Sequence, residues 1–322
     1  MDKVKRIGIL TSGGDTPGMN AVINSVVKCA IANGISVMGV QKGYAGLMEG
    51  RIVEIREEDV SGIVTKGGTI LKTARSHEFR TENGVKRALE AIRAFEIDGM
   101  IIVGGDGSFK GARDLYKAGV PTIGIPGTID NDLAYTDLTI GFITAVNTVA
   151  GEIGRIRDTM ISHERIGVIE VMGNRCGDIA LYAGLAGGAE HIIIPEVEFD
   201  VDDICIALKR EKIKGKNTSI IIISEGAGKG EPLAAYISRV TGLDVKAIVL
   251  GYIQRGGEPA PMDRMLAIKM GACAIDLLSQ GIGNRVIGIK HDNIIDMDID
   301  EALNMEPVFN SSLYELSKVL GR

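Results

Sequence analysis

The stretch RIGILTSGGDTPGMNAVINSVVKCAIANG, residues 6–34, decides the fold class of this chain. It opens with an aliphatic strand candidate, Arg6–Leu10, and passes through a glycine-rich loop. Apolar residues then recur at helical spacing from Met19 to Ile31. The stretch therefore predicts a strand, a loop and a helix that covers the strand, which is typical of parallel α/β architecture.

The ends of this first helix carry residues with positional preferences. We expect Thr16 to cap its start and Pro17 to occupy its first turn. Asn33 and Gly34 are expected to end it, because asparagine and glycine tolerate the left-handed conformation that commonly closes a helix.

The alternation of strand and helix continues to the end of the chain. Helical patterns separate the strands, so we predict an α/β fold with mainly parallel sheets. The length of 322 residues suits two domains. No proline-rich or polar linker divides them, so we expect several chain crossings between them. The further strand candidates are Val37–Val40, Gly99–Val103, Thr122–Ile125, Ile166–Val171, Ser219–Ser224, Lys246–Leu250 and Val286–Ile289.

The composition argues against several classes of protein. A net charge of -6, an aromatic content of 4% and the lack of tryptophan argue against a nucleic-acid partner. The longest purely aliphatic run, Ile220–Ile223, is too short to span a bilayer. The N-terminus does not resemble a signal peptide, so we expect a cytoplasmic protein without a membrane partner. The four cysteines fit neither a disulfide framework nor a zinc pattern, and we expect buried free thiols.

Three loops rich in glycine and aspartate follow strand candidates, at the strand ends where open α/β sheets bind ligands. They are TSGGDTPG (residues 11–18), GGDGS (residues 104–108) and PGTIDND (residues 126–132). In the first loop, glycines free backbone N–H groups to face a phosphate at a helix N-terminus. A tight turn from strand to helix would also require glycine, and this loop alone does not separate the two interpretations.

The second and third loops add carboxylates. Asp106 is placed to hold a magnesium ion that bridges phosphates. The alternative is that Asp106 and Ser108 only cap the next helix. Asp130 and Asp132 suggest a general base and its orienting partner, and the alternative for them is an Asx-type turn.

Together the loops supply a phosphate cradle, a metal ligand and a proton acceptor, which are the parts that phosphoryl transfer needs. The sequence contains no Gly-x-x-x-x-Gly-Lys-Ser/Thr stretch, so a P-loop enzyme is excluded. It also lacks Gly-x-Gly-x-x-Gly, which weakens a dehydrogenase interpretation.

With further motifs in the same order and spacing, these loops resemble the bacterial ATP-dependent 6-phosphofructokinase family nearly from end to end. The resemblance implies two similar three-layer α/β domains with mainly parallel sheets and an active site in the cleft between them. It implies an ATP-binding domain of residues 1–141 plus 254–304 and a sugar-phosphate-binding domain of residues 142–253 plus 305–322. The motifs are LTSGGD (10–15), PGMN (17–20), GGDGS (104–108), PGTIDND (126–132), TIGF (139–142), EVMG (170–173), AGGAE (186–190) and QRGG (254–257).

The resemblance also implies an activity. ATP and fructose 6-phosphate would give ADP and fructose 1,6-bisphosphate, with Mg²⁺, in a glycolytic homotetramer. Asp130 matches the base that takes the sugar hydroxyl proton and Asp132 supports it, while Arg75 and Arg175 complete the catalytic set. The positions that match nucleotide contacts are Gly14, Arg75, Ser76, Gly105, Asp106, Gly107 and Ser108, with Asp106 as the magnesium ligand. The positions that match sugar-phosphate contacts are Thr128, Ile129, Asp130, Arg165, Met172, Gly173, Asn174, Glu225, Lys246, Tyr252 and Arg255, with Arg165 supplied by a neighbouring subunit.

Two glycines bear on the phosphate donor. Relatives that use pyrophosphate carry aspartate and lysine where this chain has Gly107 and Gly127. Small residues at these positions leave room for the α-phosphate and the nucleoside, so ATP is the expected donor.

Some positions depart from the family pattern. The arginine that normally follows Met-Gly is displaced by one position, because Asn174 precedes Arg175. Tyr252 replaces a histidine, and Lys246 replaces an arginine, which keeps the charge but loses the planar guanidinium. We expect these changes to weaken or retune sugar-phosphate binding without abolishing catalysis. The alternative is that Arg175 and Tyr252 replace the usual contacts.

The family also has an effector site for ADP or phosphoenolpyruvate between subunits. Asn24 stands where the family has a basic residue, so we expect weakened regulation, although isolated surface lysines are normally just solvated. Two rival functions stay open, a kinase for another sugar phosphate and a sugar-phosphate or nucleotide sensor without turnover. Retention of Asp106 and Asp130 argues against the sensor. The matching effector positions are Asn24, Lys28, Arg157, Glu190, Lys214 and Lys216.

Overall fold

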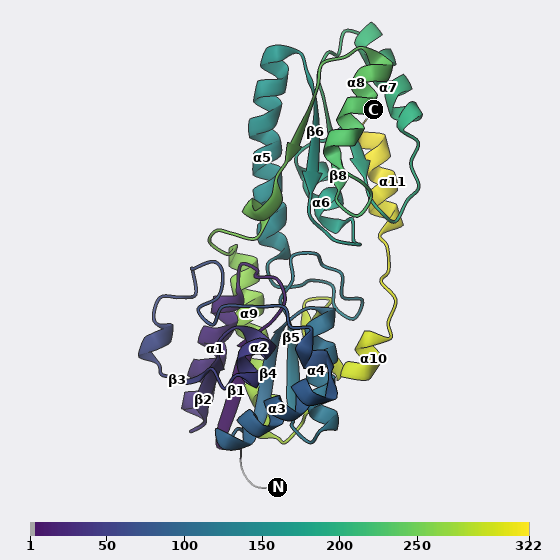
Figure 1. Cartoon of the computed structure of the whole chain (residues 1–322). Helices are drawn as coiled ribbons and strands as arrows, with labels where there is room; N and C mark the ends of the chain where they lie inside the picture. Colours follow the sequence, from purple (N-terminus) through teal and green to yellow (C-terminus); the bar gives the residue numbers. More distant parts are fainter. Residues whose placement is uncertain (1–3, 322) are drawn as a thin grey trace. The chain divides into compact units, whose positions relative to one another are not determined.

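The computed structural model describes residues 4–321, and the chain divides into two compact units, each assembled from three segments (Figure 1). The described residues of unit 1 are 4–128, 133–143 and 255–307. Those of unit 2 are 129–132, 144–254 and 308–321. The short segment Ile129–Asp132 thus groups with unit 2, although the residues on either side of it belong to unit 1.

Unit 1 is built on a seven-stranded sheet of order β11-β10-β5-β4-β1-β2-β3. The inner strands are parallel, with Ile7 of β1 opposite Val37 of β2 and Gly99 of β4. Strands β3 and β11 pair antiparallel at the two edges. The strands are β1 (Arg6–Thr11), β2 (Ser36–Val40), β3 (Ile52–Ile55), β4 (Gly99–Gly104), β5 (Thr122–Pro126), β10 (Arg285–Lys290) and β11 (Asn293–Asp298).

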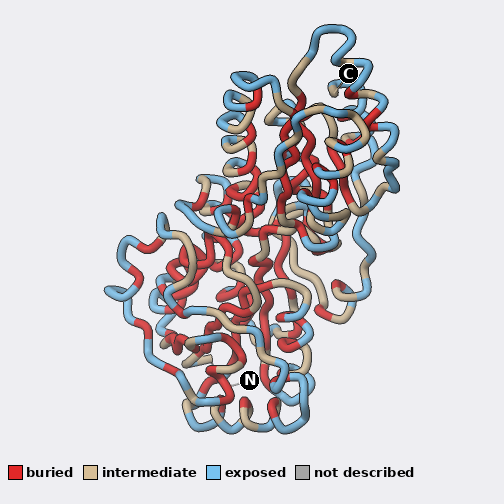
Figure 2. Tube along the Cα trace, turned by 45° about the horizontal axis from the view of Figure 1, so that its top comes forward, coloured by how far each residue is buried: buried red, intermediate tan, exposed pale blue. Residues whose placement is uncertain are grey.

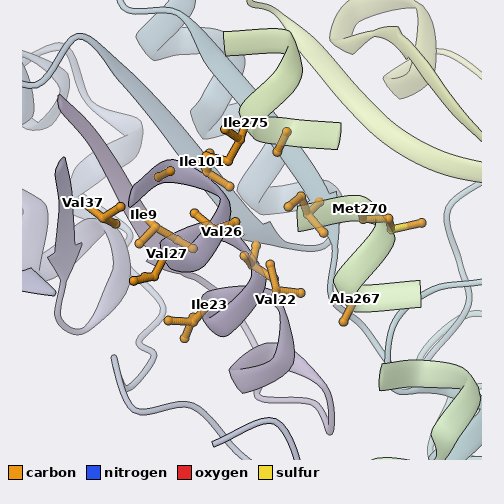
Figure 3. Packing of buried hydrophobic residues seen from close by; sticks show 14 of the residues in the cluster. Ile9, Val22, Ile23, Val26, Val27, Val37, Ile101, Ala267, Met270 and Ile275 are labelled. Atoms are coloured by element: carbon orange, nitrogen blue, oxygen red, sulfur yellow. The ribbon is translucent and has the colours of Figure 1, made fainter. Parts of the chain in front are cut away.

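Helices cover both faces of this sheet. On one face, α1 (Met19–Ala32) and α9 (Pro261–Ser279) pack over the strands, and Figure 3 shows Val26 of α1 and Met270 of α9 in the cluster that contains Ile9 and Ile101. Each such side chain contributes about 1.5–3 kcal/mol when it is fully buried. The other face is covered by α2 (Gly43–Met48), α3 (Glu82–Ala94), α4 (Asp106–Lys117) and α10 (Ile299–Leu303), and the connections include η1 (Glu58–Val60) and η2 (Glu78–Arg80).

Unit 2 is built on a four-stranded parallel sheet of order β7-β8-β6-β9. Helices α7 and α8 bury Leu208 and Ile237 against one face of it. Gly184 of α6 lies against Ile192 and Ile222 on the other face. The elements are α5 (Phe142–His163, which starts in the last unit 1 residues), β6 (Ile166–Val171), α6 (Asp178–Ala186), β7 (His191–Ile193), α7 (Val201–Ile213), β8 (Ser219–Ser224), α8 (Gly230–Thr241), β9 (Val245–Val249), η3 (Gly251–Gln254) and α11 (Ser311–Leu320).

The central strands are buried on both faces. Every residue of β4, β6 and β8 is buried, and Figure 2 shows the buried residues concentrated along the strands of each unit. Helices on both sides of a parallel sheet require such continuous apolar runs. Within residues 4–321, no helix combines the length and apolar character that a membrane crossing needs.

The strand predictions are confirmed. All the predicted strands occur as β1, β2, β4, β5, β6, β8, β9 and β10, with ends that agree to within one residue. Prediction missed β3 and β11, because edge strands are half exposed and mix apolar with charged residues. It also missed β7, which is only three residues long.

The first helix is confirmed, but the prediction for its start is wrong. The N-cap is Gly18 with φ 109°, and Pro17 lies in the turn before the helix. Thr16 is buried, and its Oγ1 donates to the Ile140 carbonyl at 3.0 Å, because a buried hydroxyl needs a partner. The end agrees with the prediction, since Asn33 is the C-cap and Gly34 has φ 72°.

The cysteines are free, as predicted, but they are not all buried. Only Cys205 is fully buried. Cys29, Cys176 and Cys273 are partly exposed. None of the four is in a disulfide.

Candidate active site

The three glycine-aspartate loops follow β1, β4 and β5, which are neighbours in the sheet of unit 1. The backbone N–H of Ser12 donates to the Val103 carbonyl at 2.9 Å, and that of Gly127 donates to the Gly104 carbonyl at 3.0 Å. Ser108 Oγ donates to the Ser12 carbonyl at 3.2 Å. The loops are therefore bonded to one another at one edge of the sheet, where ligands bind in open α/β folds.

The first loop lies beside Arg255. Gly13 has φ 91°, a conformation that favours glycine. A Cβ on Gly14 would lie 3.4 Å from Arg255 Cζ, so the guanidinium lies against the backbone of this loop. The structure thus places Arg255, a predicted sugar-phosphate contact, next to a predicted nucleotide contact.

Glycines in the second and third loops have different physical reasons. A Cβ on Gly104 would lie 2.6 Å from the Ser12 carbonyl oxygen, and one on Gly127 would lie 2.9 Å from Val103 Cγ1. Packing alone therefore requires glycine at both positions. A Cβ on Gly107 would meet no atom within 4 Å. At Gly107, in contrast to Gly104 and Gly127, the protein itself leaves room for a larger side chain.

The alternative that Asp106 and Ser108 cap the next helix is wrong. The N-cap of α4 is Gly105, and no side chain caps it. Asp106 Oδ2 instead accepts a hydrogen bond from Lys110 Nζ at 2.7 Å, and the Asp106 side chain is 47% exposed. Carboxylate oxygens suit Mg²⁺, which proteins commonly hold by one or two carboxylates together with substrate phosphates. Asp106 therefore fits the predicted ion.

The segment that carries Arg75 and Ser76 is tied to the first loop. Thr73 Oγ1 donates to the Gly13 carbonyl at 2.9 Å. Ser76 Oγ accepts a hydrogen bond from the Phe79 backbone N–H at 3.2 Å, which fixes the following turn. Arg75 is exposed, so its guanidinium faces solvent in unit 1.

The third loop continues into unit 2 as Ile129–Asp132, which we call the 129–132 loop. Before it, the Thr128 carbonyl accepts a hydrogen bond from Thr139 Oγ1 at 2.6 Å. Asn131 has φ 54°, and its Nδ2 donates to Asp178 Oδ2 at 2.8 Å. Ile129 is buried, which anchors the loop that carries Asp130 and Asp132.

A second loop of unit 2, residues 173–177, follows β6 and precedes α6. The backbone N–H of Met172 donates to Gln254 Oε1 at 3.1 Å, and Gln254 is fully buried. Gly173 has φ 139°, and a Cβ there would lie 2.3 Å from the Cys176 carbonyl oxygen. Only glycine fits this backbone.

The backbone of the same loop gives a physical reason why asparagine, and not arginine, follows Gly173. Asn174 has φ 53°, in the left-handed region where asparagine is several-fold enriched. Its backbone N–H donates to Glu225 Oε1 at 3.2 Å, so two predicted substrate contacts are joined. Arg175 follows with an exposed side chain.

The predicted phosphate-binding cations Arg165 and Lys246 converge on one carboxylate. Arg165 Nε donates to Asp244 Oδ2 at 2.6 Å, and Lys246 Nζ lies 2.7 Å from Asp244 Oδ1. The hydrogen bonds from Lys246 and Arg165 lower the pKa of Asp244 below its ordinary value. Tyr252 is 80% exposed in the same unit.

Cys176 and Asp178 are titratable groups close to these loops. Burial raises the pKa of the Cys176 thiol far above its ordinary value, and the Asp178 charge adds to this. A thiol whose pKa is raised by burial is less reactive than a free thiol. Burial also raises the pKa of Asp178, while the Asn131 amide opposes that shift.

The predicted effector residues of unit 2 centre on Glu190. Arg157 Nη1 donates to Glu190 Oε1 at 3.0 Å, Lys216 Nζ lies 3.5 Å from the same atom, and the Ile220 N–H donates to Oε2 at 2.7 Å. Burial acts to raise the pKa of Glu190, but these hydrogen bonds and charges outweigh it and lower the pKa. Lys214 is exposed at the end of α7.

The predicted effector residues of unit 1 lie on α1. Asn24 is buried, and its Nδ2 donates to the Val60 carbonyl at 2.7 Å. This amide therefore fixes η1 and carries no charge. Lys28 lies one turn later and is exposed.

Sequence reasoning gave no role to two carboxylates that the structure places among the predicted residues. Asp178 and Asp244 meet their partners across 47 and 79 positions of sequence. Asp178 follows a glycine at a helix start, and Asp244 lies two positions before Lys246, so each looks like an ordinary solvated acid in the sequence. No local pattern identified either of them.

The fold and these loops define a class, an α/β protein with glycine-aspartate loops at the carboxyl ends of neighbouring parallel strands, where such folds bind their ligands. The family model for phosphofructokinase matches residues 6–278. The chain belongs to the phosphofructokinase family.

Individual relatives agree with this family. ATP-dependent 6-phosphofructokinase from Clostridium botulinum (strain Hall) is 53% identical over 319 residues, which is 99% of this chain and 100% of the relative. The protein of the same name from Clostridium tetani is 54% identical over 318 residues, again 99% and 100% of the two chains. The structure of phosphofructokinase from Saccharomyces cerevisiae superimposes with a TM-score of 0.86 and 33% identity, covering 98% of this chain and 48% of the yeast chain.

Proposed function

We propose that this chain is an ATP-dependent 6-phosphofructokinase, which transfers the γ-phosphoryl group of ATP to fructose 6-phosphate in glycolysis and gives fructose 1,6-bisphosphate and ADP. The observation that carries the proposal is the 53% identity to an ATP-dependent 6-phosphofructokinase over the full length of that relative. The bonded arrangement of the three loops supports it, because phosphoryl transfer depends mainly on positioning and charge neutralisation.

Unit 1 binds the nucleotide in this proposal. Gly14, Ser76 and residues 105–108 contact ATP, and the half-exposed Asp106 carboxylate holds Mg²⁺. When bound, Mg²⁺ neutralises charge on the phosphate oxygens. Arg75 adds a positive charge near the transferring group. These residues correspond to an ATP-binding domain of residues 1–141 plus 254–304.

Asp130 acts as the general base. Its carboxylate takes the proton of the sugar hydroxyl while the hydroxyl oxygen bonds to the γ-phosphorus and the bond to the ADP oxygen breaks. Asp132 orients Asp130, and Arg175 stabilises negative charge on the phosphoryl oxygens. An arginine in this role contributes about 10³-fold or more to turnover in other phosphoryl-transfer enzymes.

The sugar phosphate is held by residues of the sugar-phosphate-binding domain, 142–253 plus 305–322, and of the adjoining loops. Arg165, Lys246 and Arg255 contact its existing phosphate. The dianionic phosphate can replace Asp244, which now bridges Arg165 and Lys246. The remaining contacts come from Thr128, Ile129, Met172, Gly173, Asn174, Glu225 and Tyr252.

A kinase for another sugar phosphate is the second candidate. The left-handed backbone at Asn174 and the exposed Arg175 favour it, because both change the surroundings of the sugar. Steady-state kinetics on several sugar phosphates separates the two candidates. A normal affinity for fructose 6-phosphate and weak use of the others excludes the second.

The proposal extends to assembly, location and regulation. We place the protein in the cytoplasm as a homotetramer, in which a neighbouring subunit supplies Arg165 and Lys246. Molar mass in solution tests the assembly. ADP and phosphoenolpyruvate would act through Lys28, Arg157, Glu190, Lys214 and Lys216. Their effect is expected to be weak, because Asn24 uses its amide on the Val60 carbonyl. Titration of both effectors against activity measures this.

Substitution of the base separates an enzyme from a sensor. Asp130→Asn removes the proton acceptor with little change in size, so turnover should fall about 10²- to 10⁴-fold. Binding of Mg-ATP and of fructose 6-phosphate, measured by calorimetry, should persist. Unchanged turnover in the folded variant would contradict the role of Asp130. A wild-type protein that binds both ligands without turnover would be a sensor.

A further inference from the structure

The hydrogen bond between Asn131 and Asp178 joins two loops of unit 2 that carry proposed site residues. Asn131 stands between the proposed base Asp130 and its partner Asp132, and its left-handed φ of 54° directs the chain through the 129–132 loop. Its amide donates to Asp178 Oδ2 at 2.8 Å. Asp178 is the first residue of α6 and directly follows the 173–177 loop.

Asp178 is presented by a firmly held segment. In the loop before it, the Cys176 N–H donates to the Gly173 carbonyl at 2.8 Å, and Ser224 Oγ of β8 donates to the Cys176 carbonyl at 3.3 Å. The Gly177 N–H donates to Glu196 Oε1 at 2.7 Å. The 173–177 loop is thus held by hydrogen bonds within itself, to the central strand β8 and to the Glu196 carboxylate. These bonds hold Asp178, the next residue, in place.

Stabilisation of the N-terminus of α6 does not by itself explain the surroundings of Asp178. A carboxylate in the first turn of a helix is stabilised by the helix dipole even when it is fully exposed. Asp178 is partly buried, and the charge of Glu196 adds to the burial in opposing its ionised form. The Asn131 amide offsets part of that cost, since a hydrogen bond to a charged group is stronger than one between neutral groups.

We propose that Asp178 is a positioning residue, which through the Asn131 amide fixes the backbone of the 129–132 loop and so the direction of the Asp130 carboxylate. The inference rests on the proposed function, because it assigns Asp130 as the base. A displacement of about 1 Å in a catalytic group can cost about 10²-fold in rate. Loss of the hydrogen bond between Asn131 and Asp178 would therefore be expected to lower turnover by displacing the Asp130 carboxylate.

Asp178→Ala and Asp178→Asn test the contact. The alanine variant removes the acceptor and should lower kcat with fructose 6-phosphate about 10- to 100-fold, while KM for ATP, which binds unit 1, changes less than about threefold. The asparagine variant keeps a carbonyl oxygen that can accept the hydrogen bond and should retain most of kcat. Glu231→Ala, at the exposed first turn of α8 in the same unit, is the control and should leave kcat unchanged.

Exchanging the partners gives a sharper test. Asn131→Asp sets two carboxylates against each other and should lower kcat at least as much as Asp178→Ala, since aspartate also tolerates the left-handed backbone at this position. In the double variant Asn131→Asp/Asp178→Asn, donor and acceptor are exchanged. We expect it to recover kcat about tenfold or more over Asn131→Asp alone. No recovery in a folded double variant would overturn the proposal.

Hydrogen exchange provides a readout that needs no activity. Amides of a peptide covering residues 129–132 should exchange faster in Asp178→Ala than in the wild type, and at the wild-type rate in Asp178→Asn and Glu231→Ala. Unchanged exchange in Asp178→Ala would overturn the positioning role. A wild type that is inactive on fructose 6-phosphate would overturn the proposed function instead, and the exchange rates would still decide whether Asp178 holds the loop.

Discussion

Gly107 and Gly127 show how one residue type can be required for different reasons. At Gly127 a side chain would collide with Val103 of the adjacent strand, so the fold itself excludes larger residues. At Gly107 the space is open, and the protein gives no packing reason for glycine. Selection of ATP over pyrophosphate can therefore be argued from Gly107, whereas Gly127 is explained by packing alone.

Substitutions at these positions should behave differently. Gly107→Asp should leave the unfolding free energy nearly unchanged, because its side chain enters open space. It should lower kcat/KM for ATP by about 10-fold or more, because like charges placed together cost several kcal/mol. Gly127→Ala should lower the unfolding free energy by about 1–3 kcal/mol through overpacking. Urea denaturation and initial rates measure both effects, and wild-type ATP kinetics in Gly107→Asp would contradict the explanation.

Some single residues could be predicted from sequence and others could not. The aspartates of the second and third loops could be proposed as candidates, because they follow aliphatic strands within glycine-rich turns, which is a local pattern. Asp178 and Asp244 were not, because Asp178 meets Asn131, and Asp244 meets Arg165, only across a long stretch of sequence. The prediction that Thr16 caps the first helix is wrong, because its hydroxyl donates to the carbonyl of Ile140, which lies 124 positions away.

At the scale of elements, Glu190 joins α5 to the sheet of unit 2. Arg157 of α5 donates to its carboxylate, and the backbone N–H of Ile220 in β8 donates to the other oxygen. Strands that are buried on both faces, such as β8, were predictable from the sequence. The edge strands β3 and β11 were not predictable, because their exposed faces dilute the apolar signal.

Glu190→Gln should make the free energy of unfolding less dependent on pH in the acid range. Hydrogen bonds from Arg157 and Ile220 and nearby positive charge lower the pKa of Glu190 below its ordinary value of 4.5, against the effect of burial. Its stabilising contribution is therefore fully present above that pH and is lost as pH falls through the lowered pKa. At pH 7 the variant should lose about 1–3 kcal/mol of unfolding free energy.

Denaturation at several pH values checks this prediction. The difference between Glu190→Gln and the wild type should shrink steadily below the ordinary glutamate pKa. Asp203→Asn, at an exposed first-turn carboxylate of α7, is the control and should show little difference at any pH. A constant difference across the acid range would contradict the account of Glu190.

At the scale of the whole molecule, each compact unit is assembled from three segments of chain. The α/β class was predictable from the alternating strands and helices, and two domains were expected from the length of 322 residues. The membership of Ile129–Asp132 in unit 2 was not, because it depends on contacts such as that between Asn131 and Asp178 rather than on any change of composition. Both units contain residues with a proposed role in the reaction, so activity should be measured on the intact chain.

The substrate and the phosphoryl donor can be tested in one experiment, which measures ADP release from Mg-ATP with and without fructose 6-phosphate and uses pyrophosphate as a parallel donor. The account predicts rapid release only when ATP and fructose 6-phosphate are both present, and no phosphorylation of the sugar from pyrophosphate. No sugar-dependent release from protein shown to bind ATP would contradict the assigned substrate. Equal activity with pyrophosphate would contradict the assigned donor.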